Sequence, residues 1–184
     1  MPQQLQITSS QQYLLLINYI IVLLVTCEAR YTIHREDARH KLPLAGVGFD
    51  ILAHNLETIP RLYTTARQYS HYELSLKILQ WTKALDATIY TKSGIMLGLG
   101  ETREEVLQTM DDLRKVKCDF LTIGQYLRPT PQNVEVIEYI HPDTFDRYRE
   151  EGERMGFSYV ASAPFVRSSF HAEEALKHID KKPS

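Results

Sequence analysis

Residues 88–123 read TIYTKSGIMLGLGETREEVLQTMDDLRKVKCDFLTI, and this stretch decides the fold class. Its first ten residues are mostly β-branched or apolar and run into a glycine-containing loop, which predicts a strand followed by a turn. Thr102 with Glu105 three residues later forms a capping-box pattern, so a helix is expected to begin there. Phe120–Ile123 predicts the next strand. A strand, a helix and a second strand joined by short loops indicate parallel pairing, because parallel strands need a crossover connection.

The flanking segments repeat this alternation. Tyr72–Leu85 has apolar residues at spacings of three and four, which predicts a helix. Pro142 is expected to open another helix and Gly156 to end it. The other expected elements are a strand at Gly48–Ala53, a helix capped by Thr58 with Pro60 in its first turn, a strand at Ser158–Ala161 and a terminal helix at His171–Ile179. This pattern predicts an α/β fold with a parallel sheet, and both half of an eight-unit barrel and a doubly wound open sheet fit it.

Composition sets the outer limits on function. The chain has 184 residues, 21 Lys and Arg against 23 Asp and Glu, 43% hydrophobic residues and two cysteines. This length fits one domain, and a net charge of −2 gives no electrostatic footprint for nucleic acid. Cys27 and Cys118 make neither a disulfide framework nor a four-thiolate metal site. Iron–sulfur or zinc chemistry that needs three or four thiolates cannot be completed by this chain alone.

The N-terminal residues 1–43 have a different character. The first 27 residues carry no charge, and Tyr13–Val25 is apolar except for Asn18. This run is shorter than the roughly 20 residues of a membrane span, and it lacks the basic residues and the cleavage pattern of a signal peptide. We expect a buried strand or a segment foreign to the domain, with a membrane anchor as the alternative. Residues 28–42 are charged and are expected to form a solvated linker or surface helix.

Polar residues follow or interrupt the predicted strands, where ligands bind in parallel α/β folds. They are His54–Asn55 with Glu57, Lys92–Ser93, Gly98–Glu101, Gln125–Tyr126 with Arg128, and Arg167–Ser169. Asn55 and Glu57 could instead cap the following helix, and the glycines could form only a turn. Lys92 stands in an apolar strand and must reach solvent, a ligand or a carboxylate. Because no dinucleotide fingerprint, metal-spaced cluster or nucleophile elbow is present, we expect a binding face for a small polar or anionic ligand.

Taken in order, four of these motifs resemble lipoyl synthase, a radical S-adenosylmethionine enzyme. The motifs are His54–Thr58 (HNLET), Thr91–Thr102 (TKSGIMLGLGET), Leu121–Thr130 (LTIGQYLRPT) and Val166–Phe170 (VRSSF). The resemblance runs from about Leu44 to Ala175. It implies two regions, an atypical N-terminal segment at 1–43 and the C-terminal part of a radical S-adenosylmethionine (β/α) barrel at 44–184, whose N-terminal half is missing.

The resemblance also implies a reaction. Lipoyl synthase is a sulfurtransferase that inserts two sulfur atoms into an octanoyl chain carried on a lysine of a carrier protein. One [4Fe–4S] cluster, bound by a C-x3-C-x2-C motif, cleaves S-adenosylmethionine to a 5′-deoxyadenosyl radical. A second cluster, bound by a C-x4-C-x5-C motif and a serine, is the sulfur source. Ser169 matches that serine, and its oxygen is a weaker iron ligand than thiolate, which suits a cluster that is dismantled.

Further roles are implied by position in the motifs. Asn55, Glu57, Lys92 and Ser93 would lie on the nucleoside side of the pocket, as cofactor-binding residues. Gln125, Tyr126 and Arg128 would lie near the acyl chain, as substrate-binding residues. The implied partners are an octanoylated lipoyl domain or an H-type carrier protein of glycine cleavage, and an electron donor. Neither nucleic acid nor a membrane is expected, and the implied location is the cytoplasm or, alternatively, an organelle.

Two departures from the family pattern bear on activity. Both cysteine motifs are absent from this chain, since Cys27 and Cys118 match neither of them, and Phe170 stands where the family has tyrosine. We therefore expect the chain to be inactive by itself. The alternatives are a non-catalytic module that binds the acyl-carrier protein and a membrane-tethered α/β protein.

Overall fold

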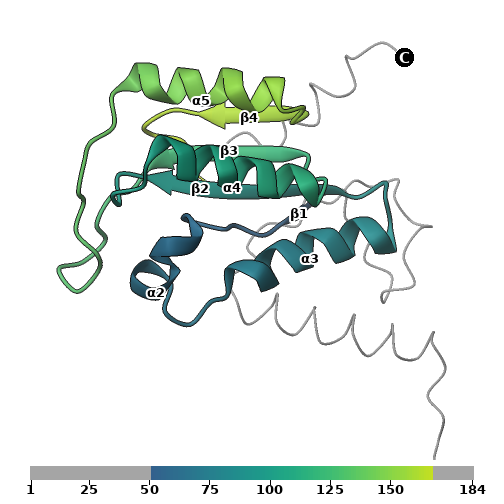
Figure 1. Ribbon diagram of the computed structural model, residues 1–184, viewed down its shortest axis with the longest axis horizontal. Helices are drawn as coiled ribbons and strands as arrows, with labels where there is room; N and C mark the ends of the chain where they lie inside the picture. Colours follow the sequence, from purple (N-terminus) through teal and green to yellow (C-terminus); the bar gives the residue numbers. More distant parts are fainter. Residues whose placement is uncertain (1–50, 168–184) are drawn as a thin grey trace, which may run out of the picture. The chain divides into compact units, whose positions relative to one another are not determined.

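The computed structural model of the protein describes residues 51–167 (Figure 1). Its four strands form one parallel sheet, in the order β1-β2-β3-β4. The strands are β1 (Ile51–Ala53), β2 (Tyr90–Leu97), β3 (Phe120–Gln125) and β4 (Tyr159–Ser162). The helices are the 3-10 turn η1 (Pro60–Leu62), α2 (Tyr63–Ala66), α3 (Tyr72–Leu85), α4 (Arg103–Lys115) and α5 (Pro142–Arg154). The predicted α/β class and parallel sheet are confirmed.

The four described strands are consistent with a partial barrel, one of the two architectures that fit the sequence. A doubly wound sheet reverses its strand order at a switch point, whereas here each strand pairs with the next one in the chain. Helices α3, α4 and α5 all pack against one sheet face. Leu79, Val106 and Phe145, one from each helix, share a buried cluster with strand residues whose side chains all point to that face. Those strand residues are Ile95, Leu97, Leu121, Ile123 and Val160. Sequential winding with one-sided helices is the pattern of a (β/α) barrel segment.

The opposite sheet face changes character along the strands. At the amino end, Ile51 and Phe120 form a small buried cluster with Tyr90 and Tyr159, and the rings of Tyr90 and Phe120 stack with centroids 5.3 Å apart. Further along, the residues of this face include Lys92, Gly94, Met96, Thr122, Gly124 and Ala161. The face is therefore aromatic near the start of the strands, and toward their carboxyl ends it carries small and polar residues together with Met96.

Local signals placed the helices well, with one exception. The capping box at Thr102 is confirmed: its hydroxyl accepts from the Glu105 amide at 3.3 Å, and the Glu105 carboxylate accepts from the Thr102 amide at 2.8 Å. The helix cap expected at Thr58 is wrong. Ile59 precedes the 3-10 turn instead, and the buried Thr58 hydroxyl has no hydrogen-bond partner in the described part of the chain. Thr58 is only 1% exposed, so its side chain belongs to the interior rather than to a helix end.

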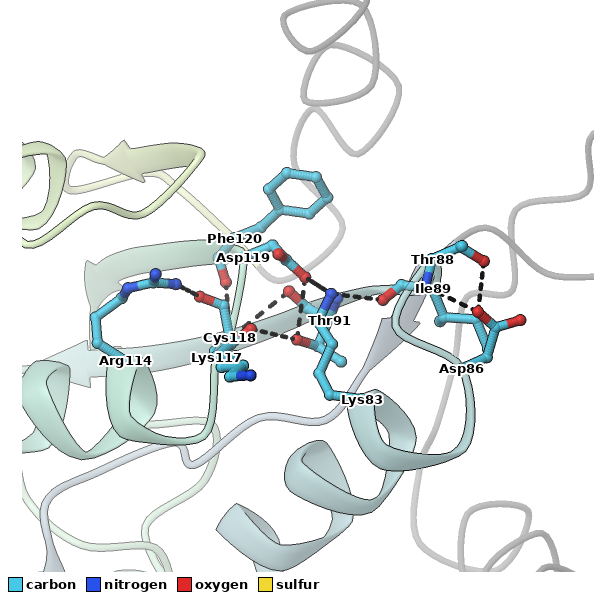
Figure 2. A network of polar contacts seen from close by, with 10 residues as sticks. All are labelled: Lys83, Asp86, Thr88, Ile89, Thr91, Arg114, Lys117, Cys118, Asp119 and Phe120. Atoms are coloured by element: carbon cyan, nitrogen blue, oxygen red, sulfur yellow. Dashed lines mark hydrogen bonds and ion pairs between the residues drawn. The ribbon is translucent and has the colours of Figure 1, made fainter.

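A polar network ties the strands together at their amino ends (Figure 2). Asp119, just before β3, accepts from the Thr91 amide at 2.7 Å and pairs with Lys83 of α3 at 2.6 Å. Lys83 also donates to the Ile89 carbonyl at 2.7 Å. Cys118 is fully buried beside this network, and burial raises the pKa of its thiol to about 12. These contacts lie at the end of the sheet opposite the ligand-binding edge, so we assign them to stability.

Several predicted features lie outside the described residues. They include the first half of the strand expected at Gly48–Ala53, whose second half is β1, the terminal helix at His171–Ile179, the apolar run Tyr13–Val25, the domain boundary at residue 43 and Ser169. Between residues 51 and 167, no helix is both long enough and apolar enough to cross a lipid bilayer.

Candidate functional site

The segment after β1 leaves the sheet for two residues and then rejoins it. The His54 amide donates to the Lys92 carbonyl at 2.9 Å, and the Glu57 amide donates to the Gly94 carbonyl at 2.8 Å. Glu57 has a φ of 67°, a left-handed backbone conformation that is uncommon outside glycine. Such a conformation costs of order 1–3 kcal/mol and persists only where its surroundings hold it. The chain therefore forms a strained turn at Asn55–Glu57, at the carboxyl end of β1.

The two polar side chains of this turn contact each other. The Asn55 amide donates to a Glu57 carboxylate oxygen at 3.1 Å. A Cβ atom on Gly94 would come within 2.7 Å of the Thr122 hydroxyl and 3.1 Å of the Asn55 side-chain oxygen. Asn55, Gly94 and Thr122 are therefore immediate neighbours on the sheet face opposite the helices. Because residue 94 is glycine, the space beside Asn55 and Thr122 stays open, whereas a side chain at this position would fill it.

Lys92 and Ser93 do not lie beyond the carboxyl end of their strand, as their grouping with the strand-end residues implied. They are the third and fourth residues of β2, and Ala53, the last residue of β1, pairs with Lys92. The expectation that Lys92 lies within a strand is confirmed, and its place among the strand-end residues is corrected. Because β1 ends early, at Ala53, this part of β2 lies beside the Asn55–Glu57 turn.

Lys92 and Ser93 point to opposite faces of the sheet, since neighbouring strand residues alternate. The Ser93 hydroxyl lies on the helix-covered face and accepts from the Leu56 amide at 3.2 Å. Lys92 lies on the other face, with Thr122 and Gly94, and is only 4% exposed. Burial lowers the pKa of Lys92 to about 8. Asn55 and Glu57 thus lie in the turn that follows the Ala53–Lys92 pair, and Lys92 lies on the sheet face of Gly94, whereas Ser93 acts on the backbone of the turn.

The loop after β2 is held by two acidic side chains. The Glu101 carboxylate accepts from the amides of Gly98 at 2.6 Å and Leu99 at 2.9 Å. Arg61 pairs with both oxygens of Glu105, at 2.7 and 2.9 Å, and donates to the Gly100 carbonyl at 2.8 Å. This arrangement fixes the loop between β2 and α4 at the carboxyl edge of the sheet.

Gln125, Tyr126 and Arg128 all organise the segment that follows β3. The Gln125 side chain is buried, donates to the Glu138 carbonyl at 3.1 Å and accepts from the Ile140 amide at 2.9 Å. The Tyr126 hydroxyl donates to the Val134 carbonyl at 2.9 Å. Arg128 donates to the Asn133 and Pro131 carbonyls and pairs with Glu135. The structure therefore places these three residues together, in contact with the backbone of the loop over residues 127–140.

The segment after β4 crosses the sheet at Gly124. A Cβ atom on Gly124 would overlap the Val166 carbonyl oxygen, so only glycine allows this close approach. Arg167, the last described residue, donates to the Pro164 and Val166 carbonyls. The predicted cluster ligand, Ser169, lies two residues beyond, outside the described part of the chain.

Thiolate and metal chemistry find no support among the described residues. No group of three or more His, Cys, Asp or Glu side chains between residues 51 and 167 could hold a metal ion. Cys118 is fully buried, and its raised pKa keeps it a neutral thiol, which is not the ligand form. What the site offers is a buried ammonium, an amide and a carboxylate, a combination suited to a small polar ligand that carries hydroxyl groups and a negative charge.

Sequence reasoning missed three residues that shape the site: Thr122, Arg61 and Arg67. Thr122 needed the β2–β3 register to place it beside Gly94. Arg61 could be placed only once the conformation of the loop after β2 was known, because it binds the Gly100 carbonyl of that loop. Arg67 donates to the carbonyls of Asn55 and Leu56, contacts that leave no pattern in the sequence. Thr122 stands inside the motif Leu121–Thr130, and the only available signal for Arg61 and Arg67 was their nearness in the chain to the motif His54–Thr58.

The fold is that of an α/β protein with a parallel sheet, and the candidate ligand groups lie at the end of β1 and beside it in β2. No protein-family model matches the chain. It is 56% identical over 130 residues to the lipoyl synthase of Caldicellulosiruptor saccharolyticus, covering 71% of this chain and 46% of the relative. It is 52% identical over 130 residues to that of Treponema denticola, covering 71% and 43%. An apicoplast lipoyl synthase of Plasmodium knowlesi is 51% identical over 132 residues, covering 71% and 30%.

The chain thus spans less than half the length of these relatives. Over about seven tenths of its own length it belongs with the lipoyl synthases, as their C-terminal part, and the resemblance carried by the four motifs is confirmed.

Proposed function

We propose that this chain is the nucleoside- and acyl-facing part of a lipoyl synthase, which inserts sulfur into a protein-bound octanoyl chain using S-adenosylmethionine and iron–sulfur clusters. The observation that carries the proposal is the Asn55–Glu57 turn that directly follows the pairing of Ala53 with Lys92, in a chain that is 56% identical to a lipoyl synthase over 130 residues. The sequential parallel sheet within residues 51–167 supports a partial (β/α) barrel. We propose that this barrel part extends over 44–184, and that 1–43 is a separate segment.

The side chains on this face fit S-adenosylmethionine. That molecule carries ribose hydroxyls, an amino group and a carboxylate. Asn55 and Glu57 offer an amide and a carboxylate suited to the ribose hydroxyls of the nucleoside, and Lys92 is a buried cation suited to acceptor atoms of the nucleoside. When bound, S-adenosylmethionine supplies the radical chemistry of the reaction. The residues of this chain bind and orient it, and Ser93 holds the turn that carries Asn55 and Glu57.

The iron–sulfur clusters do not fit this chain alone. It has two cysteines, of which Cys118 is fully buried, and no group between residues 51 and 167 could hold a metal ion. Ser169 is proposed as one cluster ligand that acts only together with thiolates supplied from outside this sequence. The chain by itself is accordingly proposed to be inactive.

The acyl side of the site is proposed to be the loop over residues 127–140. Gln125, Tyr126 and Arg128 hold this loop, so their effect on the octanoyl chain is exerted through its shape. Ile137 and Tyr139 on the same loop are 65% and 73% exposed, which gives the loop apolar surface for an alkyl chain. The proposed partners are an octanoylated lipoyl domain or an H-type carrier protein, together with an electron donor.

The proposed compartment is the cytoplasm, or an organelle as for the apicoplast relative. The membrane tether and the non-catalytic carrier-binding module are not preferred, since no observation on residues 51–167 favours either.

The nucleoside assignment is tested by titrating the ¹⁵N-labelled full chain with S-adenosylmethionine and following amide resonances by NMR. We expect shifts at Asn55, Glu57 and Lys92 and none at Lys83 or Asp119, which lie at the opposite end of the sheet. Lys92→Met should abolish the shifts. Equal shifts at both ends of the sheet, or none at the turn, would refute the assignment.

The claim of inactivity is tested separately. The chain is reconstituted anaerobically with iron and sulfide and then assayed with octanoylated carrier, S-adenosylmethionine and a reductant. We expect neither stoichiometric four-iron clusters by Mössbauer spectroscopy nor a lipoylated carrier by mass spectrometry. Two four-iron clusters per chain would contradict the claim.

A further inference from the structure

The turn at Asn55–Glu57 presents two of the proposed ligand groups, yet its backbone is strained. Glu57 is left-handed, with a φ of 67°, and β1 has already ended at Ala53. On one side the turn is held by β2, through the Ser93 hydroxyl and the Gly94 carbonyl. The carbonyls of Asn55 and Leu56 face the other way, toward α2 and the residues that follow it.

One residue binds both of these carbonyls. Arg67, directly after α2, donates through a single guanidinium nitrogen to the Asn55 carbonyl at 2.9 Å and to the Leu56 carbonyl at 3.2 Å. Tyr63 of α2 adds a hydrogen bond from its hydroxyl to the Leu56 carbonyl, at 2.7 Å. The Arg67 guanidinium lies over the Tyr63 ring, 5.6 Å from the centroid. The two side chains thus form one unit that closes over the turn.

The neighbouring ionisable side chain is compatible with this cation. His54 is 9% exposed and lies close enough to Arg67 for the two to interact electrostatically. Burial and the Arg67 charge both favour the neutral imidazole, so no second cation competes with the guanidinium for the carbonyls.

We infer that Arg67 is a positioning residue for the nucleoside site: by binding the Asn55 and Leu56 carbonyls it holds the left-handed turn that presents the Asn55 amide and the Glu57 carboxylate. The inference rests on the proposed function for its ligand, but the hold on the turn is a property of this chain alone. Arg67 touches no ligand itself. Its effect reaches the site through the backbone, which a lysine could reproduce only in part, since it lacks the planar guanidinium that lies over the Tyr63 ring.

The test uses the full ¹⁵N-labelled chain in three forms: wild type, Arg67→Met and Arg67→Lys. Arg149→Met is the control, because Arg149 makes an exposed ion pair with Asp146 on α5, at 2.9 Å. Amide hydrogen exchange is measured at Leu56 and Glu57 relative to Leu121 and Ile123 in the buried strand β3. Each variant is then titrated with S-adenosylmethionine under conditions where Trp81 fluorescence shows it to be folded.

We expect Arg67→Met to raise exchange at Leu56 and Glu57 about tenfold or more relative to β3, since it removes charge-assisted bonds to both carbonyls. S-adenosylmethionine affinity should fall by a similar factor, with Arg67→Lys intermediate and the control unchanged. If Arg67→Met proves unstable, Tyr63→Phe removes one bond to the Leu56 carbonyl and should show the same pattern at smaller size.

The outcomes separate the two proposals. If the wild-type chain shows no S-adenosylmethionine shifts at the turn, the proposed nucleoside site fails, while the exchange data still decide whether Arg67 holds the turn. If the wild type binds and Arg67→Met binds equally well with unchanged exchange at Leu56 and Glu57, the positioning role of Arg67 is wrong.

Discussion

The buried histidine of the turn predicts a specific loss of stability in acid. His54 is 9% exposed, its Nε2 atom has no hydrogen-bond partner within residues 51–167, and Arg67 lies near it. Desolvation, aided by the Arg67 charge, lowers the pKa of His54 to about 4 from an ordinary value of 6.5. Protonation therefore places an unpaired cation in an apolar site beside another cation.

The size and sign of this change in the free energy of unfolding follow from the linkage between protonation and folding. The unfolded chain takes up this proton near pH 6.5 and the folded chain only near pH 4, so stability is complete above 6.5 and is lost as pH falls toward 4. At about 1.4 kcal/mol per pKa unit, the full loss is about 3 kcal/mol. This is a large fraction of the stability of an ordinary domain.

The assay is urea unfolding at a series of pH values between 7 and 4, followed by the fluorescence of Trp81, the only tryptophan in the chain. His54→Gln should remove most of the pH dependence in this window, whereas His71→Gln, at an exposed position before α3, should follow the wild type. If the free energy of unfolding of His54→Gln falls in parallel with the wild type from pH 6.5 to 4, the reasoning is refuted.

Three further predictions concern other buried groups. Burial lowers the pKa of Lys92 to about 8 from 10.5, so wild-type stability should increase as pH rises from 8 to 10.5; in the same urea assay Lys92→Met should lack that increase and be more stable at pH 7. Asp119→Ala leaves Lys83 and the Thr91 amide without their half-buried partner and should cost about 1–3 kcal/mol; adding Lys83→Met should recover part of this, and a double variant no better than Asp119→Ala would contradict the pairing seen in Figure 2. Because burial raises the pKa of Cys118 to about 12, maleimide should label Cys118 only in urea, as read by peptide mass mapping, and labelling in buffer would show that the thiol is accessible.

Helix bounds and fold class followed from local sequence signals. The apolar spacing over Tyr72–Leu85 coincides with α3, and the capping box at Thr102 starts α4 as expected, because both signals act within a few residues. Thr58 shows the limit of such reasoning. Its neighbour Pro60 does open a turn, but the strained segment before it turns the Thr58 side chain inward, and that strain depends on partners in β2 and after α2.

The candidate site was predictable in its residue types but not in its assembly. Asn55, Glu57 and Lys92 stood out as polar residues near strands, yet the place of the turn relative to Lys92 depends on β1 ending at Ala53, which pairs with Lys92. Ser93 fell on the helix-covered face, which only the register decides. Arg67 binds backbone carbonyls, and any residue type supplies those, so no sequence pattern indicates the contact.

The central claim is that this sequence carries a working C-terminal part of lipoyl synthase, and a chimera tests it most directly. The C-terminal part of the Caldicellulosiruptor saccharolyticus relative is replaced by residues 44–184 of this chain, and lipoyl formation on an octanoylated carrier is measured by mass spectrometry. The account predicts a lipoylated product, lost in the same chimera with Lys92→Met while iron content stays unchanged. A folded chimera that binds its clusters and S-adenosylmethionine but forms no lipoyl group would contradict it.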